Sequence, residues 1–180
     1  MRDAPAAVTL DDVAAMNVAD QLGRRYEMSP DGVLSVMPLA DSEHAAVASR
    51  ICAWLARAGW PAEQLLQAAG VQFPGQNGVG GRIPDLTVWA APQPRSIWLS
   101  VTDLLLVVEI VSLGFEAMDQ VVKVREYAQA GIPRYWVIDR DAAQTATLHV
   151  LSADKTYEVA VRMPLARLLE TAPADHNIGG

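Results

Sequence analysis

One apolar run, at residues 104–112, is interrupted by a single carboxylate, that of Glu109. A short run rich in Val, Leu and Ile is typical of a strand buried on both faces in the middle of a sheet. The alternation of side chains along such a strand places Glu109 on the same face as Val107 and Val111. An unpaired ionised carboxylate there would cost several kcal/mol, so we expect Glu109 to be protonated, paired with a cation or bound to a metal ion. The alternative is a residue at the strand end that faces solvent.

The polar and apolar positions before this run predict a helix, a β-hairpin and a second helix. Thr9 is a suitable N-cap for a short amphipathic helix at 9–20, which we expect to cover the core. Residues 24–28 and 33–37 flank a stretch of strong turn formers, as the arms of a hairpin do. Apolar residues at spacings of three and four predict the second helix at 41–59.

Two polar side chains in these elements can be explained without a role in a functional site. Glu27 lies in the first arm of the hairpin, where a glutamate is most often solvated. His44 lies in the first turn of the second helix, where a histidine most often has a structural role or none.

Between the second helix and the apolar run we predict a strand at 64–73, a glycine-rich loop at 74–81 and a strand at 86–90, followed by a loop at 91–102. The glycine-rich stretch lacks the Gly-Lys-Ser/Thr of phosphate-binding loops and precedes a strand, so it indicates a flexible connection. The proline before Asp85 favours extended backbone, which places this carboxylate at the start of the strand on rigid backbone.

After the apolar run, the pattern predicts a helix at 115–130 that ends at a glycine. An acid four residues before a lysine is a common surface pair worth ~0.3 to 0.5 kcal/mol, and this is one interpretation of Asp119 and Lys123. A strand at 134–139 and a hairpin at 147–161 complete the pattern.

This order of elements predicts an α/β (α+β) fold, a mixed β-sheet flanked by helices with β-hairpins near both ends. The chain has 180 residues. On folding, a domain of this size buries roughly 70% of the surface that its extended chain exposes to solvent. We therefore expect a single domain over 1–180, with its core at about 8–161. The tail at 170–180 has little to bury and is expected to be loose.

The composition of the chain limits the kinds of partner that it can bind. No apolar stretch approaches the ~20 residues that span a bilayer, and the first residues lack the features of a signal peptide, so we expect a soluble, cytoplasmic protein without a membrane partner. The net charge is −7, and the chain has no basic run. Because nucleic-acid binders usually carry a basic face, a nucleic-acid partner would require a local patch, a metal ion or a second subunit.

The candidate chemistry rests on carboxylates. One cysteine and three widely separated histidines support a zinc site poorly, whereas oxygen ligands favour Mg²⁺ or Mn²⁺. Asp85, Glu109 and Lys123 supply two oxygen ligands and one cation on rigid elements. Metal-assisted attack of water on a phosphodiester requires groups of these kinds.

Several short motifs share the order and spacing of a known family. They are Arg-Tyr-Glu at 25–27, His44, Pro-Asp at 84–85, Val-Glu-Ile-Val-Ser at 108–112, Asp119, Lys123, Tyr127, Gly-Ile-Pro at 131–133, Tyr-Trp at 135–136 and Asp139. Together they resemble the Uma2 family, also called the domain of unknown function 820, of restriction-endonuclease-like proteins in the PD-(D/E)XK superfamily. The resemblance covers roughly 8–161 and is most specific at 108–139. The resemblance implies that the predicted mixed sheet has the restriction-endonuclease-like fold.

The resemblance also implies roles for individual residues. Asp85 and Glu109 match the metal-binding carboxylates, and Glu27 matches an early glutamate that is either a third ligand or a group that supports the other two. In the plain form of the superfamily a lysine follows the second acid by two residues, but here that position is Val111. Uma2-like chains carry a helix lysine instead, and Lys123 matches it.

Two further positions match without a settled role, His44 and Tyr127, and we retain them as site candidates of lower rank. The chain departs from the family after Ser112, where Leu-Gly-Phe at 113–115 replaces a more polar, proline-containing segment. This difference bears on the loop near Glu109 more than on the chemistry.

The function implied by the resemblance is a Mg²⁺-dependent (or Mn²⁺-dependent) endonuclease that hydrolyses phosphodiester bonds, with DNA as the expected nucleic acid. Nucleases of this kind often pair to reach both strands of a duplex, so we expect a homodimer, although no stretch identifies its interface. One fold hosts many functions, so the alternative is a catalytically weak or inactive binding or regulatory module.

Overall fold

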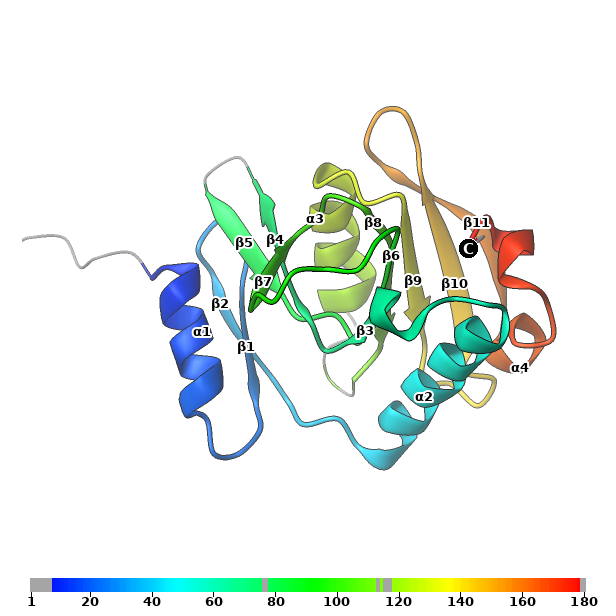
Figure 1. Ribbon diagram of the computed structural model, residues 1–180, viewed down its shortest axis with the longest axis horizontal. Helices are drawn as coiled ribbons and strands as arrows, with labels where there is room; N and C mark the ends of the chain where they lie inside the picture. The colour runs from blue at the N-terminus through cyan, green and yellow to red at the C-terminus, as the bar shows by residue number, and fades with distance from the viewer. Residues whose placement is uncertain (1–7, 76–77, 113, 115–117, 179–180) are drawn as a thin grey trace, which may run out of the picture.

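The computed structural model describes residues 8–75, 78–112, 114 and 118–178, with only the backbone of Asp119. It contains two mixed β-sheets with helices packed against them (Figure 1). The smaller sheet has the spatial order β2 (Leu34–Met37), β1 (Arg25–Met28), β5 (Val79–Arg82), β4 (Gly70–Pro74) and β7 (Trp98–Ser100). The larger sheet has the order β11 (Tyr157–Pro164), β10 (Thr145–Leu151), β9 (Arg134–Ile138), β8 (Leu104–Ile110), β6 (Leu86–Trp89) and β3 (Leu65–Gln67). The predicted fold class is confirmed, although the strands divide between two sheets.

Strand β8 lies in the middle of the larger sheet, and both of its faces are covered. Leu106 and Val108 pack with residues of α2 (Ser42–Arg57) in one hydrophobic cluster. Val107 packs in a second cluster with residues of α3 (Lys123–Gln129). The apolar run therefore forms the doubly buried strand that its composition predicts.

The helices begin where the sequence places their caps. In α1 (Leu10–Ala19), the Thr9 hydroxyl accepts from the Asp12 N–H at 3.2 Å while the Asp12 carboxylate accepts from the Thr9 N–H at 2.8 Å. The Asp41 carboxylate caps α2 by accepting from the His44 N–H at 2.9 Å. Helix α1 covers the smaller sheet, as expected (Figure 1). In the described part of the chain, no helix has both the length and the apolarity to cross a membrane.

The prediction of one strand at 64–73 is wrong. A 3-10 turn (Ala62–Gln64) leads into two short strands that belong to different sheets, β3 and β4. The break falls at Ala68, whose φ of 50° is incompatible with extended backbone. The Ala68 N–H donates to the carbonyl oxygen of Asp85 at 3.3 Å, so this break also fixes the backbone at the start of β6.

The glycine-rich stretch at 74–81 is in part a strand and not the flexible connection predicted for it. Its residues 76–77 lie outside the described residues, but β5 pairs with both β4 and β1. A Cβ on Gly80 would lie 2.7 Å from Cδ of Pro30, and one on Gly81 would lie 2.6 Å from Cδ2 of Leu10. These glycines permit close packing of the hairpin and α1 against β5.

Two other connections contain more structure than the pattern predicts. The loop at 91–102 includes β7, which runs parallel to β4 and buries Trp98 beneath α1. The helix predicted at 115–130 begins outside the described residues and is a π-helical turn at Met118–Val122 before it becomes α3. Its predicted end at Gly131 is confirmed by a φ of 81°.

The prediction of a loose tail at 170–180 is wrong for its described residues. The short helix α4 (Leu165–Leu168) and a 3-10 turn (Pro173–His176) lead to Ile178, which is 2% exposed in the same core as α2. The indole N–H of Trp54 donates to the carbonyl oxygen of Thr171 at 2.9 Å. The tail therefore closes the face of the sheet that α2 covers.

Candidate active site

Glu109 projects from β8 toward α3, on the same side of the sheet as Val107 and Tyr127. Its Oε1 lies 2.9 Å from Nζ of Lys123 and accepts a hydrogen bond from the Tyr127 hydroxyl at 2.9 Å. Glu109 is 3% exposed and Lys123 is 1% exposed. The interpretation of Glu109 as a solvent-facing residue is wrong, and so is that of Lys123 as half of a surface pair. The side chain of Asp119, the other half, lies outside the described residues.

Asp85 lies beside this pair because of the register between β6 and β8. Leu86 pairs with Val108 in antiparallel fashion, so the preceding residue on β6 lies next to Glu109. The Oδ2 atom of Asp85 accepts from the Ile110 N–H at 2.8 Å, which fixes the carboxylate at the end of β8. The sequence expectation that Asp85 begins a strand is confirmed.

Arg25 and His44 both face Asp85. Its Oδ1 accepts from Nη1 of Arg25 at 3.1 Å, and its Oδ2 lies 3.0 Å from Nε2 of His44. Burial raises the pKa of this carboxyl, but the imidazole of His44, the charge of Arg25 and the N–H of Ile110 outweigh it and bring the pKa below its usual value. Asp85 is therefore ionised at neutral pH.

His44 is buried at the N-terminus of α2, where the cap at Asp41 orients the first turn. Its Nε2 is within ion-pair distance of Asp85, but no acceptor among the described residues lies on the line of a hydrogen bond from this atom. The ordinary interpretation of an incidental surface histidine is wrong, because the ring is buried and its Nε2 lies 3.0 Å from a carboxylate oxygen.

Glu27 is also buried, so the expectation of a solvated hairpin residue is wrong. Its Oε1 accepts from the Ile83 N–H at 2.8 Å. Its Oε2 lies 3.4 Å from Nη1 of Arg82 and 3.8 Å from Nζ of Lys123. Arg82 in turn binds the two carboxylate oxygens of Glu126 at 2.7 and 2.8 Å. The hairpin thus contributes a second carboxylate close to the lysine, in addition to Glu109 on β8.

Sequence reasoning did not select the two arginines of this site. Arg25 is two residues before Glu27 on β1, and side chains two apart on a strand share a face, so this spacing was an available signal. Arg82 precedes Asp85 by three residues, but only the pairing of β5 with β1 brings it near the hairpin glutamate. Neither arginine could be assigned to a partner without that pairing.

The electrostatics tie the cluster together. Burial lowers the pKa of the Arg25 guanidinium, but the charges of Asp85, Glu109 and Glu27 outweigh it and raise the pKa above its usual value. Burial, reinforced by the nearby carboxylates, raises the pKa of Tyr127 well above its usual value, so the phenol stays neutral and donates to Glu109. All three carboxylates therefore act on one partly exposed arginine.

The donor set suits a hard divalent cation. Mg²⁺ prefers oxygen ligands, keeps several waters and needs only one or two protein carboxylates. Asp85 and Glu109 provide two at adjacent strand positions. No group of three His, Cys, Asp or Glu side chains in the described ranges is arranged to hold a metal. The two carboxylates thus have the chemistry to hold Mg²⁺ or Mn²⁺ with water completing the coordination, in exchange for the Arg25 and Lys123 contacts that they make here.

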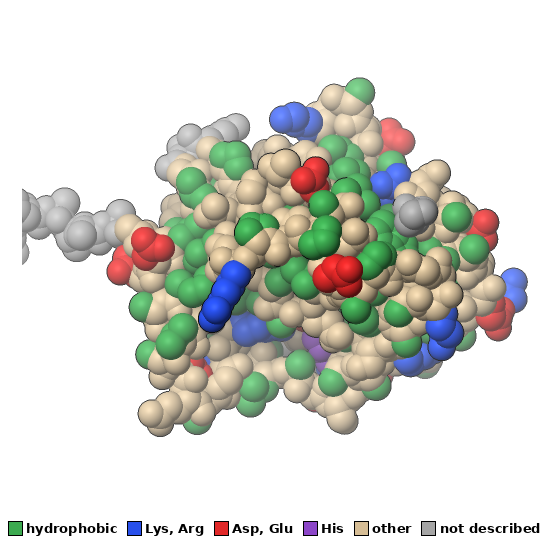
Figure 2. Space-filling model, in the orientation of Figure 1, with side chains coloured by type: hydrophobic (Ala, Val, Ile, Leu, Met, Phe, Trp, Pro, Cys, Tyr) green, Lys and Arg blue, Asp and Glu red, His purple; other side chains and the backbone are tan. Residues whose placement is uncertain are grey.

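A hollow in the surface lies between α2 and the β1–β2 hairpin, and histidine and basic side chains are visible inside it (Figure 2). Among the cations of the site, Arg25 has the most exposed side chain, at 21%. The acids beneath it are almost fully buried. Arg25 is thus the site's basic group most accessible to an anionic ligand.

A mixed sheet that joins two acids on adjacent strands to a buried lysine has the organisation of restriction-endonuclease-like proteins. The family model described as "Putative restriction endonuclease", Uma2, matches residues 10–173. The chain belongs to the Uma2 family.

A solved structure has a similar fold. It is described as the crystal structure of a "putative nuclease belonging to DUF820" from Anabaena variabilis, and it matches with a TM-score of 0.62 and 17% sequence identity over 84% of this chain and 83% of that one. A comparison with curated proteins finds no match. Family and fold together indicate a nuclease.

Proposed function

We propose that this protein is a Mg²⁺-dependent endonuclease that hydrolyses phosphodiester bonds in DNA. The observation that supports the proposal most strongly is that Asp85 and Glu109 lie side by side by the register of two strands, with Nζ of Lys123 2.9 Å from Oε1 of Glu109. Asp85 directly precedes β6, Glu109 lies in β8 and Lys123 is the first residue of α3, so regular elements position these side chains. Rigid support of this kind is what precise catalytic geometry requires.

Asp85 and Glu109 would hold the ion. When bound, Mg²⁺ stabilises negative charge on the phosphoryl oxygens and makes a nearby water more acidic. Lys123 donates a hydrogen bond to the attacking water and orients its lone pair toward the phosphorus. The new P–O bond forms as the bond to the leaving sugar oxygen breaks. The attacking water gives up a proton to solvent, and the leaving oxygen takes one up from solvent.

The surrounding residues position these groups. Tyr127 holds Glu109 by a hydrogen bond, and Glu27 lies on the other side of the lysine. Arg25 is already beside Asp85 and is the cation most accessible from outside, so it can bind a phosphate oxygen of the substrate.

The same burial favours a second candidate function. The acids are paired with cations and nearly excluded from solvent, which suits a structural ion-pair cluster as well as a catalytic site. For a polymeric substrate to reach Asp85 and Glu109, side chains that cover them must move. A chain in which they do not move would be an inactive module that binds or regulates a partner.

Cleavage of supercoiled plasmid separates the two functions. With Mg²⁺ or Mn²⁺, the wild type should nick or linearise the plasmid, and Asp85→Asn and Glu109→Gln should lose the activity, by more than about a hundredfold. Glu170→Gln is a matched control, because this glutamate is surface-exposed and pairs with Arg167 on α4. Equal cutting by all four proteins would indicate contamination, and no cutting by any of them would favour the inactive module.

Two finer points belong to the same experiment. A parallel assay on single-stranded RNA of equal length tests whether DNA is the substrate. The proposal predicts that the DNA is cleaved faster than the RNA. Concerted linearisation, as opposed to accumulation of nicked circles, is expected if the protein acts as a homodimer. Sedimentation velocity of the same preparation should then give a mass near twice 19.4 kDa.

A further inference from the structure

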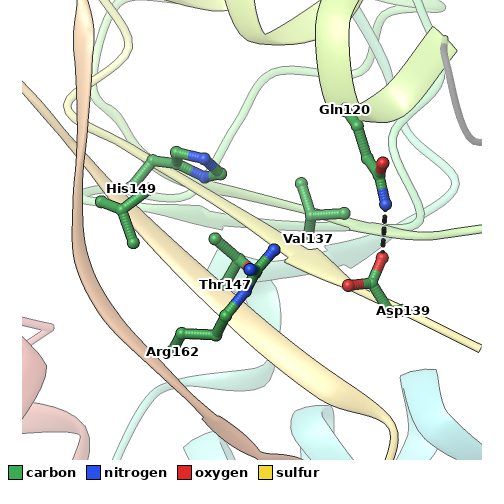
Figure 3. Close-up of a pocket in the computed structure, with 7 residues that line it drawn as sticks. Gln120, Val137, Asp139, Thr147, His149 and Arg162 are labelled. Carbon is green, nitrogen blue, oxygen red and sulfur yellow. Dashed lines mark hydrogen bonds between the residues drawn. The ribbon is translucent and has the colours of Figure 1, made fainter. Parts of the chain in front are cut away.

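A cavity of about 280 Å³ lies on the larger sheet, on the face that also carries Glu109 (Figure 3). It is lined by residues from the π-helical turn and from strands β9 to β11. These residues are Gln120, Val137, Asp139, Thr147, His149, Val159 and Arg162. The proposed catalytic residues do not include any of them.

The sheet register places the cavity beside the candidate active site. Val137 on β9 pairs with Glu109 on β8 and also with Thr147 on β10. Thr147 pairs with Arg162 on β11. Paired residues project from the same face, and neighbouring strands are ~4.8 Å apart, so the Arg162 backbone is about 14 Å from that of Glu109.

A second connection runs along the ends of the strands. Asp139, at the end of β9, lines the cavity and also a smaller hollow together with His44 and Ile110. Both His44 and Ile110 contact the carboxylate of Asp85. Asp139 therefore lies between the cavity and the residues around Asp85, although the smaller hollow, of about 10 Å³, does not itself admit a nucleotide.

The cavity holds a cation in a fixed orientation. Nε of Arg162 donates to the Thr147 hydroxyl at 3.1 Å, and this contact orients the planar guanidinium. No other group among the described residues contacts its terminal nitrogens through a hydrogen bond or an ion pair. Two such nitrogens can bind two oxygens of one phosphate at once.

The cavity also presents acceptors. One oxygen of Asp139 accepts from the Gln120 amide at 2.6 Å, as Figure 3 shows, while the other is not engaged in the described part of the chain. Nδ1 of His149 lies 3.0 Å from the carbonyl oxygen of Tyr135, which can only accept, so Nδ1 carries the proton and Nε2 is an acceptor. Burial lowers the pKa of His149 and supports this neutral form.

A nucleotide matches this combination of groups. Its phosphate suits Arg162, the exocyclic amino group of its base suits Asp139, and the faces of the base suit the apolar side chains of Val137 and Val159. The volume is at the small end of ligand pockets, which run from about 300 to 1,000 Å³, so a duplex cannot enter. An unpaired nucleotide splayed out of its strand can.

We propose that this cavity binds one unpaired nucleotide of the strand that is cut at Asp85 and Glu109. The inference rests on the proposed function for the strand, but binding of the nucleotide alone does not depend on cleavage. It predicts a preference for bases with an exocyclic amino group and for single-stranded or gapped DNA over intact duplex.

The test is a titration of the full chain with dCMP and with dTMP, without metal, followed by NMR or calorimetry. Wild type should bind dCMP more tightly than dTMP, and Arg162→Gln should weaken dCMP binding at least tenfold. Asp139→Asn should reduce the preference for dCMP. Arg167→Gln, which changes an exposed arginine on α4, is the control and should bind as the wild type does.

The outcomes separate this inference from the proposed function. If dCMP binds through Arg162 but no DNA is cut, the cavity assignment stands and the nuclease proposal fails. If DNA is cut in an Asp85-dependent way while dCMP does not bind, or binds equally to Arg162→Gln, the cavity assignment is wrong. Urea unfolding of each variant identifies any that has failed to fold. If Arg162→Gln fails to fold, Arg162→Lys takes its place, because it keeps the charge but loses the planar guanidinium.

Discussion

Lys123→Met removes the ammonium group from the buried cluster and keeps an unbranched side chain of similar length. Glu109 would retain the Tyr127 hydrogen bond but would lose the cation that lies 2.9 Å away. Because both members of the pair are almost completely buried, we expect a large loss of stability.

The magnitude follows from this burial. Breaking a buried ion pair by removing one partner costs about 3 to 5 kcal/mol, because an uncompensated charge remains inside. An exposed pair would be worth only about 0.2 to 1 kcal/mol. At ~2 to 4 °C per kcal/mol for a chain of this size, Tm should fall by roughly 10 °C. Removing both charges, in Lys123→Met with Glu109→Gln, should restore part of the loss, since a neutral pair leaves no isolated charge.

Urea unfolding followed by tryptophan fluorescence measures these differences. Lys155→Met is the matched control, because Lys155 is exposed in the turn between β10 and β11 and should change the free energy of unfolding by less than about 0.5 kcal/mol. If Lys123→Met is as stable as Lys155→Met, the lysine is not a buried partner of Glu109 and the reasoning about the site fails.

Three other predictions follow. Tyr127→Phe removes the donor to Glu109 and should cost about 1.5 to 3 kcal/mol in urea unfolding, the range for hydrogen bonds to charged groups; a loss near zero would contradict the buried contact. Arg24 lowers the pKa of Asp20 to about 2, so this carboxylate stabilises the fold above its unfolded pKa near 3.8 and loses the effect as pH falls toward 2. The difference in urea midpoint between wild type and Asp20→Asn should therefore shrink between pH 3.8 and pH 2, and a constant difference would refute the pairing. Ile178→Ala should cost about 2 to 5 kcal/mol in the same assay, and a cost below 0.5 kcal/mol would mean that the tail is not part of the core.

The centre of the fold was predictable because its local signals agree. The apolar run at 104–112 specifies a doubly buried strand, and the proline before Asp85 places a carboxylate at a strand start. Both acids could therefore be selected before their distance was known. Lys123 was different, because its spacing to Asp119 is equally typical of a surface pair, so its place beside the two acids as the cation of the site depended largely on the family resemblance.

Other parts depend on contacts that no local pattern contains. The split at Ala68 needs a left-handed alanine, which its packing against the start of β6 imposes. The glycines of β5 look like a flexible loop, but they make room for Pro30 and Leu10. The tail looks polar and loose because its buried side chains, Pro173 and Ile178, are isolated from one another in the sequence. In each case tertiary packing overrides the local signal.

The arginines show the same limit at the site itself. Arg25 reaches Asp85 across 60 positions of sequence, and Arg82 reaches Glu27 across 55. A sequence can supply the types of these residues but not which acid each one pairs with. The pairing of β1 with β5 decides this.

The central claim is that Asp85 and Glu109 together hold a divalent cation. A crystal structure of the protein grown with Mn²⁺, with data collected at the manganese absorption edge, tests it most directly. The account predicts one anomalous peak about 2.1 Å from an oxygen of each carboxylate, absent in Glu109→Gln. A wild-type structure with no peak there, and with Arg25 and Lys123 still on the two carboxylates, would contradict it.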